Sequence, residues 1–296
     1  MLANWPLIAL RIAESIVFFA VMIGSIVAVI VPIVVSAGLW RPDLEHERDP
    51  GTAFVDLALA HWLLIVYILL IVSVVLLLLI GIHSFVEAGC ARIFVNAEHA
   101  AGNAPVGREP FRAFDINQWM QGGWHSWWSV FWIYNLAWSL GGLVLLVPLL
   151  GTLALMMVFG DTGPRVAAGC IGLVISFLVM IPVAVVMGLW TQKAIAITVA
   201  RGAGAGAALR LGWNEIMADL GRHLGVAVIV FVVAFGGAMA ISMVTFPLSL
   251  AHQQSAFSGL MLAPAQLVVS FVQAVFSSAV GLWFLASYVG LTEERT

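Results

Sequence analysis

The feature that most constrains the fold is the length of the segments that lack a charged side chain. No Asp, Glu, Lys or Arg occurs between His223 and Thr292, and none occurs between Leu57 and Val86. Of the 296 residues, 62% are hydrophobic and only 9% are charged, whereas soluble domains have about 45–50% apolar and about 25% charged residues. The sequence therefore predicts an integral membrane protein and excludes an ordinary water-soluble domain.

The uncharged segments divide into six predicted crossings. A helix needs about 20 apolar residues to span the roughly 30 Å hydrocarbon core, so the last segment must cross twice, with the polar residues 251–255 as its turn. The apolar runs lack the alternation of outer-membrane strands, so we expect helices. They cover residues 15–39, 57–86, 126–158, 166–192, 224–250 and 258–290. We expect an all-α membrane protein with a single integral-membrane domain over residues 1–296.

The positions of the basic residues indicate the orientation. With six crossings, one side of the membrane collects Arg11, Arg92, Arg108, Arg112, Lys193, Arg201, Arg210, Arg222 and Arg295, and the other collects Arg41, Arg48 and Arg165. Loops that face the cytoplasm are enriched in Lys and Arg, so both termini are predicted to be cytoplasmic. The first crossing is longer than the apolar core of a typical signal peptide, so we expect it to be retained. The strong preference for Arg over Lys favours a bacterial origin and hence the inner membrane.

The crossings also suggest three repeated hairpins. The odd crossings carry Pro32, Pro148 and Pro247, and the even ones carry Gly81, Gly188 and Gly281. An amphipathic segment precedes each odd crossing. In the third such segment, for example, Leu209, Trp213 and Ile216 share one helical face. The hypothesis is that each hairpin follows an interfacial amphipathic helix.

Paired crossings after an interfacial segment rich in Trp and Phe, such as Phe114-x4-Trp119, resemble a group of uncharacterised bacterial membrane families. One of these is the membrane domain attached to some glycerophosphodiester phosphodiesterases. The resemblance covers most of the chain and implies a bundle of six helices. It implies no catalytic residues, since the chain lacks the phosphodiesterase domain itself.

Polar residues inside the predicted crossings are the first candidates for function, because such residues are costly in lipid. The last crossing carries Gln266, Ser270, Gln273 and Ser277 on one helical face, and the fifth carries Ser242 and Thr245. One interpretation is a path for a small neutral or lipid-like solute; the other is hydrogen bonding between helices. The middle of each crossing lacks charged residues, which disfavours an ion-coupled carrier.

Two charged residues lie at similar positions near the cytoplasmic ends of even crossings. Glu87 is six residues after Gly81, and Lys193 is five residues after Gly188. We expect Glu87 and Lys193 to form a structural ion pair, with a gate or a lipid head-group site as the alternative.

Three histidines are candidates for cofactor binding. His83, His125 and His223 are predicted near the cytoplasmic end, and haem iron accepts His ligands. A haem- or quinone-binding electron-transfer subunit is therefore one hypothesis. Histidines beside Trp at a membrane interface are common without a cofactor, however, so we expect no cofactor and no metal.

Tryptophans are concentrated at the start of the third crossing, where Trp124, Trp127, Trp128 and Trp132 lie within nine residues. An aromatic belt at the membrane boundary is one explanation. A docking face for another membrane subunit is the other, because aromatic residues are enriched at protein interfaces.

The sequence does not favour catalysis. It contains no HExxH, GxSxG, P-loop or dinucleotide-binding motif. Nucleic-acid binding is excluded as well, since 12 basic residues stand against 15 acidic ones without a basic run. The predicted function is that of a non-catalytic accessory or scaffolding subunit of a larger membrane complex, with the lipid bilayer and other membrane proteins as partners. A transporter or channel, and the electron-transfer subunit, are the alternatives.

Overall fold

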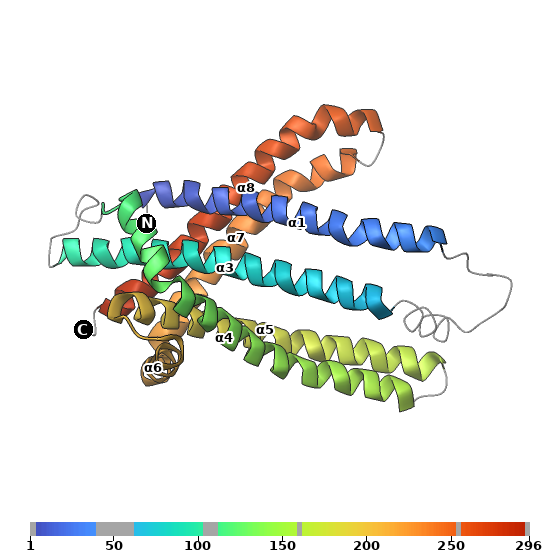
Figure 1. Cartoon of the computed structure of the whole chain (residues 1–296), viewed down its shortest axis with the longest axis horizontal. Coiled ribbons are helices and arrows are strands. Elements are labelled where there is room, and N and C mark those ends of the chain that lie inside the picture. Colours follow the sequence, from blue (N-terminus) through green and yellow to red (C-terminus); the bar gives the residue numbers. More distant parts are fainter. Residues whose placement is uncertain (1–3, 40–61, 103–111, 159–161, 253–255, 294–296) are drawn as a thin grey trace. The chain divides into compact units, whose positions relative to one another are not determined.

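The computed structural model describes residues 4–39, 62–102, 112–158, 162–252 and 256–293 (Figure 1). These residues form seven helices and no strand, which confirms the predicted all-α fold. The helices are α1 (Pro6–Leu39), α3 (Trp62–Ala101), α4 (Ile116–Val158), α5 (Thr162–Arg201), α6 (Ala205–Ala218), α7 (Leu220–His252) and α8 (Ala256–Glu293). Six of them, all except α6, are long and apolar enough to cross a membrane, as predicted.

Several helices continue well beyond the predicted crossings. Helix α3 runs to Ala101 instead of ending near residue 86, and α4 begins at Ile116 instead of residue 126. At 40 residues, α3 is about 60 Å long at 1.5 Å per residue, roughly twice the thickness of the hydrocarbon core. The extensions contain polar residues. Packing against other helices, rather than contact with lipid, stabilises their helical form.

A separate amphipathic helix is present for only one of the three predicted units. Helix α6 matches the third prediction, and it is separated from α7 at Asp219, whose backbone is not helical (φ −145°, ψ 56°). The first and second amphipathic segments are continuous with the crossings in α1 and α4. The hypothesis of three equivalent units is therefore not confirmed.

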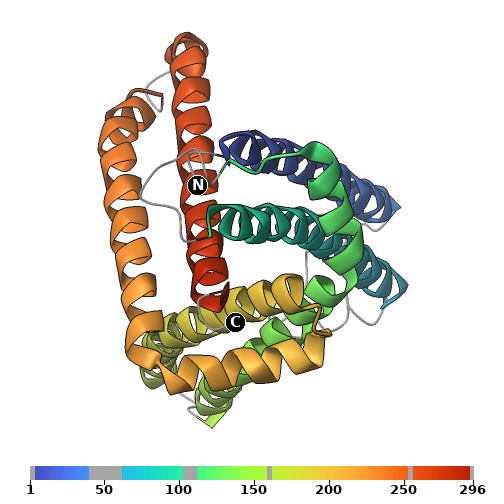
Figure 2. The same cartoon turned by 90° about the vertical axis from the view of Figure 1, so that its left-hand side faces the viewer.

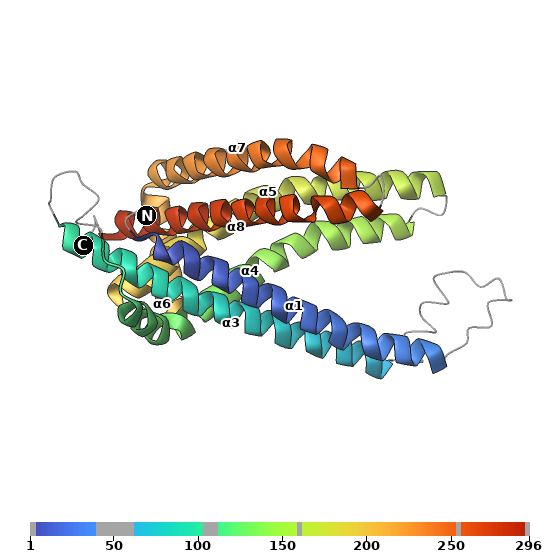
Figure 3. The ribbon, with the colours of Figure 1, turned by 90° about the horizontal axis from the view of Figure 1, so that it is seen from above.

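The chain divides into two compact units. The smaller, Ala13–His83, contains most of α1 and the first half of α3. The two helices lie side by side in it (Figures 1 and 3). His83 Nδ1 lies 2.6 Å from Glu14 Oε1, and the Tyr67 hydroxyl donates to the carbonyl of Ala28 at 3.4 Å. These contacts connect the hairpin at both ends of its shared length.

The larger unit consists of Met1–Ile12 and Ser84–Thr296. Helix α5 packs against α4, α6 and α8, and α7 packs against α8. The buried apolar residues cluster where α3, α5 and α8 end and α4 begins, together with α6 (Figure 2). We call this region, formed by residues 84–101, 116–141, 187–218 and 282–293, the packed end.

Small residues allow α3 and α4 to approach closely at the packed end. Gly89 lies against the indole of Trp119, and a Cβ atom there would be 2.8 Å from Trp119 Cδ1. Phe85 packs edge-on against Trp119 with ring centroids 5.4 Å apart. Trp119 itself is only 9% exposed, so it is the aromatic centre of this contact.

Two glycines end the extended helices. Gly102 follows α3 with φ 47°, and Gly202 follows α5 with φ 66°, a left-handed conformation that favours glycine. The Gly102 N–H donates to the carbonyl of Glu98 at 3.0 Å, which is the pattern of a left-handed helix cap. Both helices therefore stop at positions fixed by the sequence.

Outside the packed end, the membrane-spanning segments bury little of their surface inside the chain. In the most apolar 18-residue window of each span, only 0–11% of the residues are buried. Lipid tails are as apolar as the side chains themselves. Apolar helices in a membrane therefore gain little by burying their surfaces against one another. Their sides are available to lipid or to another protein.

Candidate functional site

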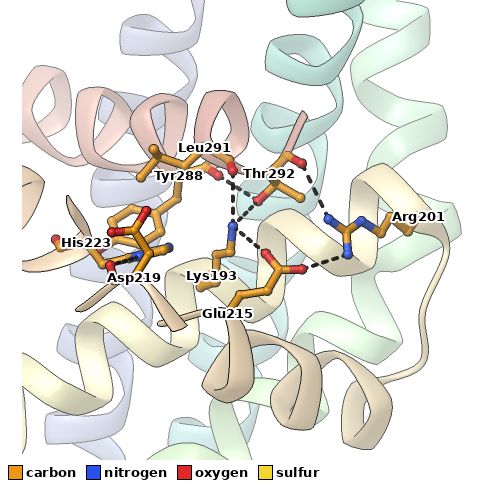
Figure 4. Close-up of polar contacts among 8 residues, drawn as sticks. All are labelled: Lys193, Arg201, Glu215, Asp219, His223, Tyr288, Leu291 and Thr292. Atoms are coloured by element: carbon orange, nitrogen blue, oxygen red, sulfur yellow. Dashed lines mark hydrogen bonds and ion pairs between the residues drawn. The ribbon is translucent and has the colours of Figure 1, made fainter. Parts of the chain in front are cut away.

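The packed end contains a lysine that is fully buried, at 0% exposure. Lys193 Nζ lies 2.9 Å from Glu215 Oε2 and donates to Thr292 Oγ1 at 2.9 Å and to the Leu291 carbonyl at 3.4 Å. Figure 4 shows these contacts, which join α5, α6 and α8. A buried cation requires an opposite charge and hydrogen-bond partners, and Lys193 has both.

Glu215 is shared between two cations. Arg201 Nη1 donates to Glu215 Oε1 at 2.8 Å, while Lys193 contacts the other carboxylate oxygen. Burial alone would raise the pKa of the Glu215 carboxyl, but hydrogen bonds and attraction from Lys193 and Arg201 outweigh it and hold this pKa below its ordinary value of 4.5. The Glu215 carboxylate therefore remains charged near neutral pH. We call Lys193, Arg201, Glu215 and Thr292 the clamp, because their contacts join three helices.

The predicted pair between Glu87 and Lys193 is replaced by two separate contacts. Glu87 forms an ion pair with Arg11 at the start of α1 and accepts a hydrogen bond from Gln192 Nε2 at 3.1 Å. Lys193 instead contacts Glu215, because α6 folds back against α5 and brings its carboxylate there. The predicted ion pair between Glu87 and Lys193 is therefore wrong, and each residue has a different partner.

The three histidine candidates lie in different surroundings. His223 is 1% exposed, its Nδ1–H donates to the Asp219 carbonyl at 2.8 Å, and Tyr288 donates to its carbonyl at 3.2 Å (Figure 4). His83 belongs to the smaller unit, where it contacts Glu14. His125 lines an open cavity at the packed end. The haem or quinone hypothesis stays a prediction.

That cavity, of about 1280 Å³, lies between the end of α3 and the start of α4 and reaches the end of α5. Its polar lining includes Arg92 and His99 from α3, Arg112 before α4, and His125 from α4. Amide side chains complete the lining, and Asn96 Nδ2 donates to Gln118 Oε1 across it at 2.7 Å. The cavity is thus positively charged and rich in hydrogen-bond donors.

The predicted tryptophan face is exposed on α4. Trp124, Trp128 and Trp132 are 65%, 53% and 42% exposed, and Trp127 is half-buried. The rings contact each other: Trp128 stacks on Phe131 with centroids 5.4 Å apart and meets Trp132 edge-on at 5.8 Å. We call these five residues, Trp124, Trp127, Trp128, Phe131 and Trp132, the aromatic face.

The predicted polar faces of the last two crossings are placed as follows. On α8, Gln266 is half-buried, whereas Ser270, Gln273 and Ser277 are exposed. On α7, Ser242 and Thr245 help to line a hollow of about 630 Å³, and all of its described lining residues belong to α7. The Thr245 hydroxyl donates to the Ser242 carbonyl at 3.0 Å, so its hydrogen bond lies within the helix. The solute path and the interhelical hydrogen bonds both stay predictions.

The sequence patterns do not single out Glu215, Arg92 or Arg112 as site residues. Glu215 lies on the polar face of an amphipathic helix, which favours a solvent-exposed position. A useful signal was Lys193, the chain's single lysine, in an otherwise apolar stretch, because such a residue needs a carboxylate partner.

Comparison with models of known protein families, with curated proteins and with solved structures finds no match. The resemblance to the membrane domain of glycerophosphodiester phosphodiesterases stays a prediction.

Proposed function

We propose that this protein is a non-catalytic accessory or scaffolding subunit that binds another membrane protein through the aromatic face of α4. The observation that carries this proposal is the exposure of Trp124, Trp128 and Trp132 on one membrane-spanning helix. Aromatic side chains supply large contact areas and dominate interface energetics. The partner is a membrane protein with an apolar transmembrane helix.

The length of the aromatic face favours docking over an interfacial belt. A belt lies at the level of the lipid head groups, whereas residues 124–132 extend about 12 Å along the helix at 1.5 Å per residue. The rings of Trp128, Phe131 and Trp132 also contact one another. This mutual packing orders the rings in advance and lowers the entropy lost on docking.

The low burial of the spans supports the same proposal. Only 0–11% of the residues in their most apolar windows are buried inside the chain, so their sides can contact other helices. The clamp around Lys193 meanwhile fixes α5, α6 and α8 at the packed end. A rigid base with accessible spans suits a protein that positions other membrane subunits.

We place the basic part of the packed end, residues 92–101 and 193–218, on the cytoplasmic side of the inner membrane of a bacterial cell, with both termini on that side. The support is the charge distribution: Arg92, Lys193 and Arg201 all belong to the packed end, and basic residues concentrate on the cytoplasmic side.

The test is purification in a mild detergent, with mass spectrometry of the membrane proteins that co-migrate. We compare the wild type with W128L/W132L and with the control variant F231L/F235L. Phe231 and Phe235 are also exposed, at 62% and 55%, and stack on each other with centroids 5.9 Å apart, but they lie on α7. We expect the wild type and the α7 control to retain a co-migrating membrane protein that W128L/W132L loses. A monomer that captures no membrane protein even after cross-linking, or equal capture by the two variants, would overturn the proposal.

A further inference from the structure

The cavity between α3 and α4 differs in charge from the rest of the packed end. Arg92, Arg112, His99 and His125 line it, and among the residues that the structure describes no Asp or Glu lines it. One carboxylate reaches its rim, where Glu293 Oε2 lies 2.8 Å from His99 Nε2. The two arginines therefore give the described part of the cavity a positive charge that no acidic lining residue of that part neutralises.

Three other cations in the larger unit have acidic partners. Arg11, Lys193 and Arg201 each contact a carboxylate. Within the part of the chain that the structure describes, no acidic side chain pairs with Arg92 or Arg112, although Asp115 lies close by and accepts the Asn117 N–H at 2.9 Å. Ion pairs thus account for the first group of cations, whereas the two guanidinium groups at the cavity are available to a ligand.

The local packing holds Arg92 in place. A Cβ atom at Gly122 would overlap the Arg92 side chain, so the glycine lets the arginine stem lie directly across α4. The hydrogen bond between Asn96 and Gln118 connects α3 to α4 beside it. Arg92 is therefore positioned by packing against α4 rather than extended freely from the end of a helix.

We propose that this cavity binds a phosphate group. Guanidinium groups match the oxygens of a phosphate in paired hydrogen bonds, and the amides of Asn96, Asn117 and Gln121 supply further donors. The volume of about 1280 Å³ exceeds that of a typical small-molecule site. Trp124 also lines the cavity. The phosphate belongs either to an anionic lipid head group or to a soluble phosphate compound.

The experiment uses the full chain, purified in a neutral detergent, with two probes. The first is inorganic phosphate, titrated at constant ionic strength and followed by the unfolding temperature. The second is phosphatidylglycerol in nanodiscs, compared with phosphatidylcholine nanodiscs and followed by native mass spectrometry of the lipids that remain bound after release. Stabilisation by phosphate alone identifies a soluble source, and selective retention of phosphatidylglycerol alone identifies a lipid source.

Three single substitutions remove one positive charge each. R92Q and R112Q change the cavity, whereas R210Q changes an exposed arginine of α6 that does not line it. We expect R92Q and R112Q to weaken binding of the effective probe about tenfold or more, and R210Q to bind like the wild type. Because Arg92 and Arg112 are exposed, we expect both variants to unfold at the wild-type temperature without a probe.

A second pair of variants keeps every charge. G122A forces Arg92 to move, whereas G142A places a methyl group on the same helix where nothing lies within 4 Å. We expect G122A to weaken binding as R92Q does, and G142A to leave it unchanged. The proposal is overturned if the wild type binds neither probe, or if R92Q and R112Q both bind as R210Q does. If R92Q or G122A fails to fold, R112Q alone decides between these outcomes.

Discussion

Lys193 illustrates how a single residue determines the stability of the packed end. It is the only lysine in the chain, and it is fully buried between Glu215 and Thr292. Removing one partner of a buried ion pair costs about 3–5 kcal/mol. We expect K193M to lower the free energy of unfolding by about 3 kcal/mol, at the lower end because Arg201 still contacts Glu215.

Tryptophan fluorescence during thermal unfolding in detergent measures this, and R210M, at an exposed position, is the control. Equal unfolding temperatures for K193M and R210M would contradict the structural role of the clamp.

The carboxylate of the same cluster makes stability depend on pH. The pKa of Glu215 is lower in the folded protein than its ordinary value of 4.5, because Lys193 and Arg201 outweigh the effect of burial. A depressed carboxyl pKa contributes stability that is complete above the unfolded pKa and is lost as pH falls through the folded one. We expect the wild type to unfold at a higher temperature than E215Q by a constant margin at neutral pH, and this margin to shrink below about pH 4.5. A margin that stays constant down to about pH 3 would show that the carboxylate is not the stabilising group.

At this scale the sequence predicts that ionic groups near the packed end are paired, but not with which partners. Glu87 and Lys193 occupy similar positions after Gly81 and Gly188, and the sequence offers no sign that α6 folds back onto α5. Helical periodicity assigns Glu215 to a polar face and says nothing about the element that this face meets. Partner choice depends on the long-range packing of α5 against α6, and local patterns do not carry that information.

At the scale of the element, the helices themselves are predictable and their ends are not. The length of the uncharged segments identifies all six crossings, because only a long apolar helix can span the hydrocarbon core. The extensions of α3 to Ala101 and of α4 back to Ile116 contain polar residues and depend on contacts such as Gly89 with Trp119. Such contacts depend on the neighbouring helix, so hydropathy alone stops each prediction too early.

Two adjacent glycines on α7 test how closely that helix packs against α8. A Cβ atom at Gly237 would overlap the ring of Phe276, whereas at Gly236 nothing lies within 4 Å. Overpacking of this kind costs about 1–3 kcal/mol. We expect G237A to lower the unfolding temperature and G236A to leave it unchanged or slightly raised, since alanine favours a helix over glycine in both. Similar results for the two variants would show that α7 and α8 do not pack at this point.

At the scale of the whole molecule, six long apolar helices are the dominant feature. Six spans with 0–11% burial in their most apolar windows expose apolar surface that suits a lipid bilayer. The threefold repeat suggested by Pro32, Pro148 and Pro247 is not matched by three separate interfacial helices, because α1 and α4 run on without a break like that at Asp219. The recurring prolines and glycines therefore leave the hypothesis of three equivalent units unconfirmed.

The orientation of the whole molecule is the last prediction, and single cysteines test it in intact cells. Cys90 is buried, so replacing the exposed Cys170 by serine leaves a background without an accessible thiol. In this background we expect R210C, on α6, to react with a membrane-impermeant maleimide only after the cells are permeabilised, because the basic residues of the packed end face the cytoplasm. Position 45, in the acidic loop before the second crossing and outside the described residues, is expected to react in intact cells as E45C.

R108C, also outside the described residues, should behave like R210C, since two crossings separate them. Labelling of R108C and R210C from opposite sides would contradict the number of spans. Labelling of both in intact cells would show the opposite orientation, with the cavity of Arg92 and Arg112 outside the cytoplasm.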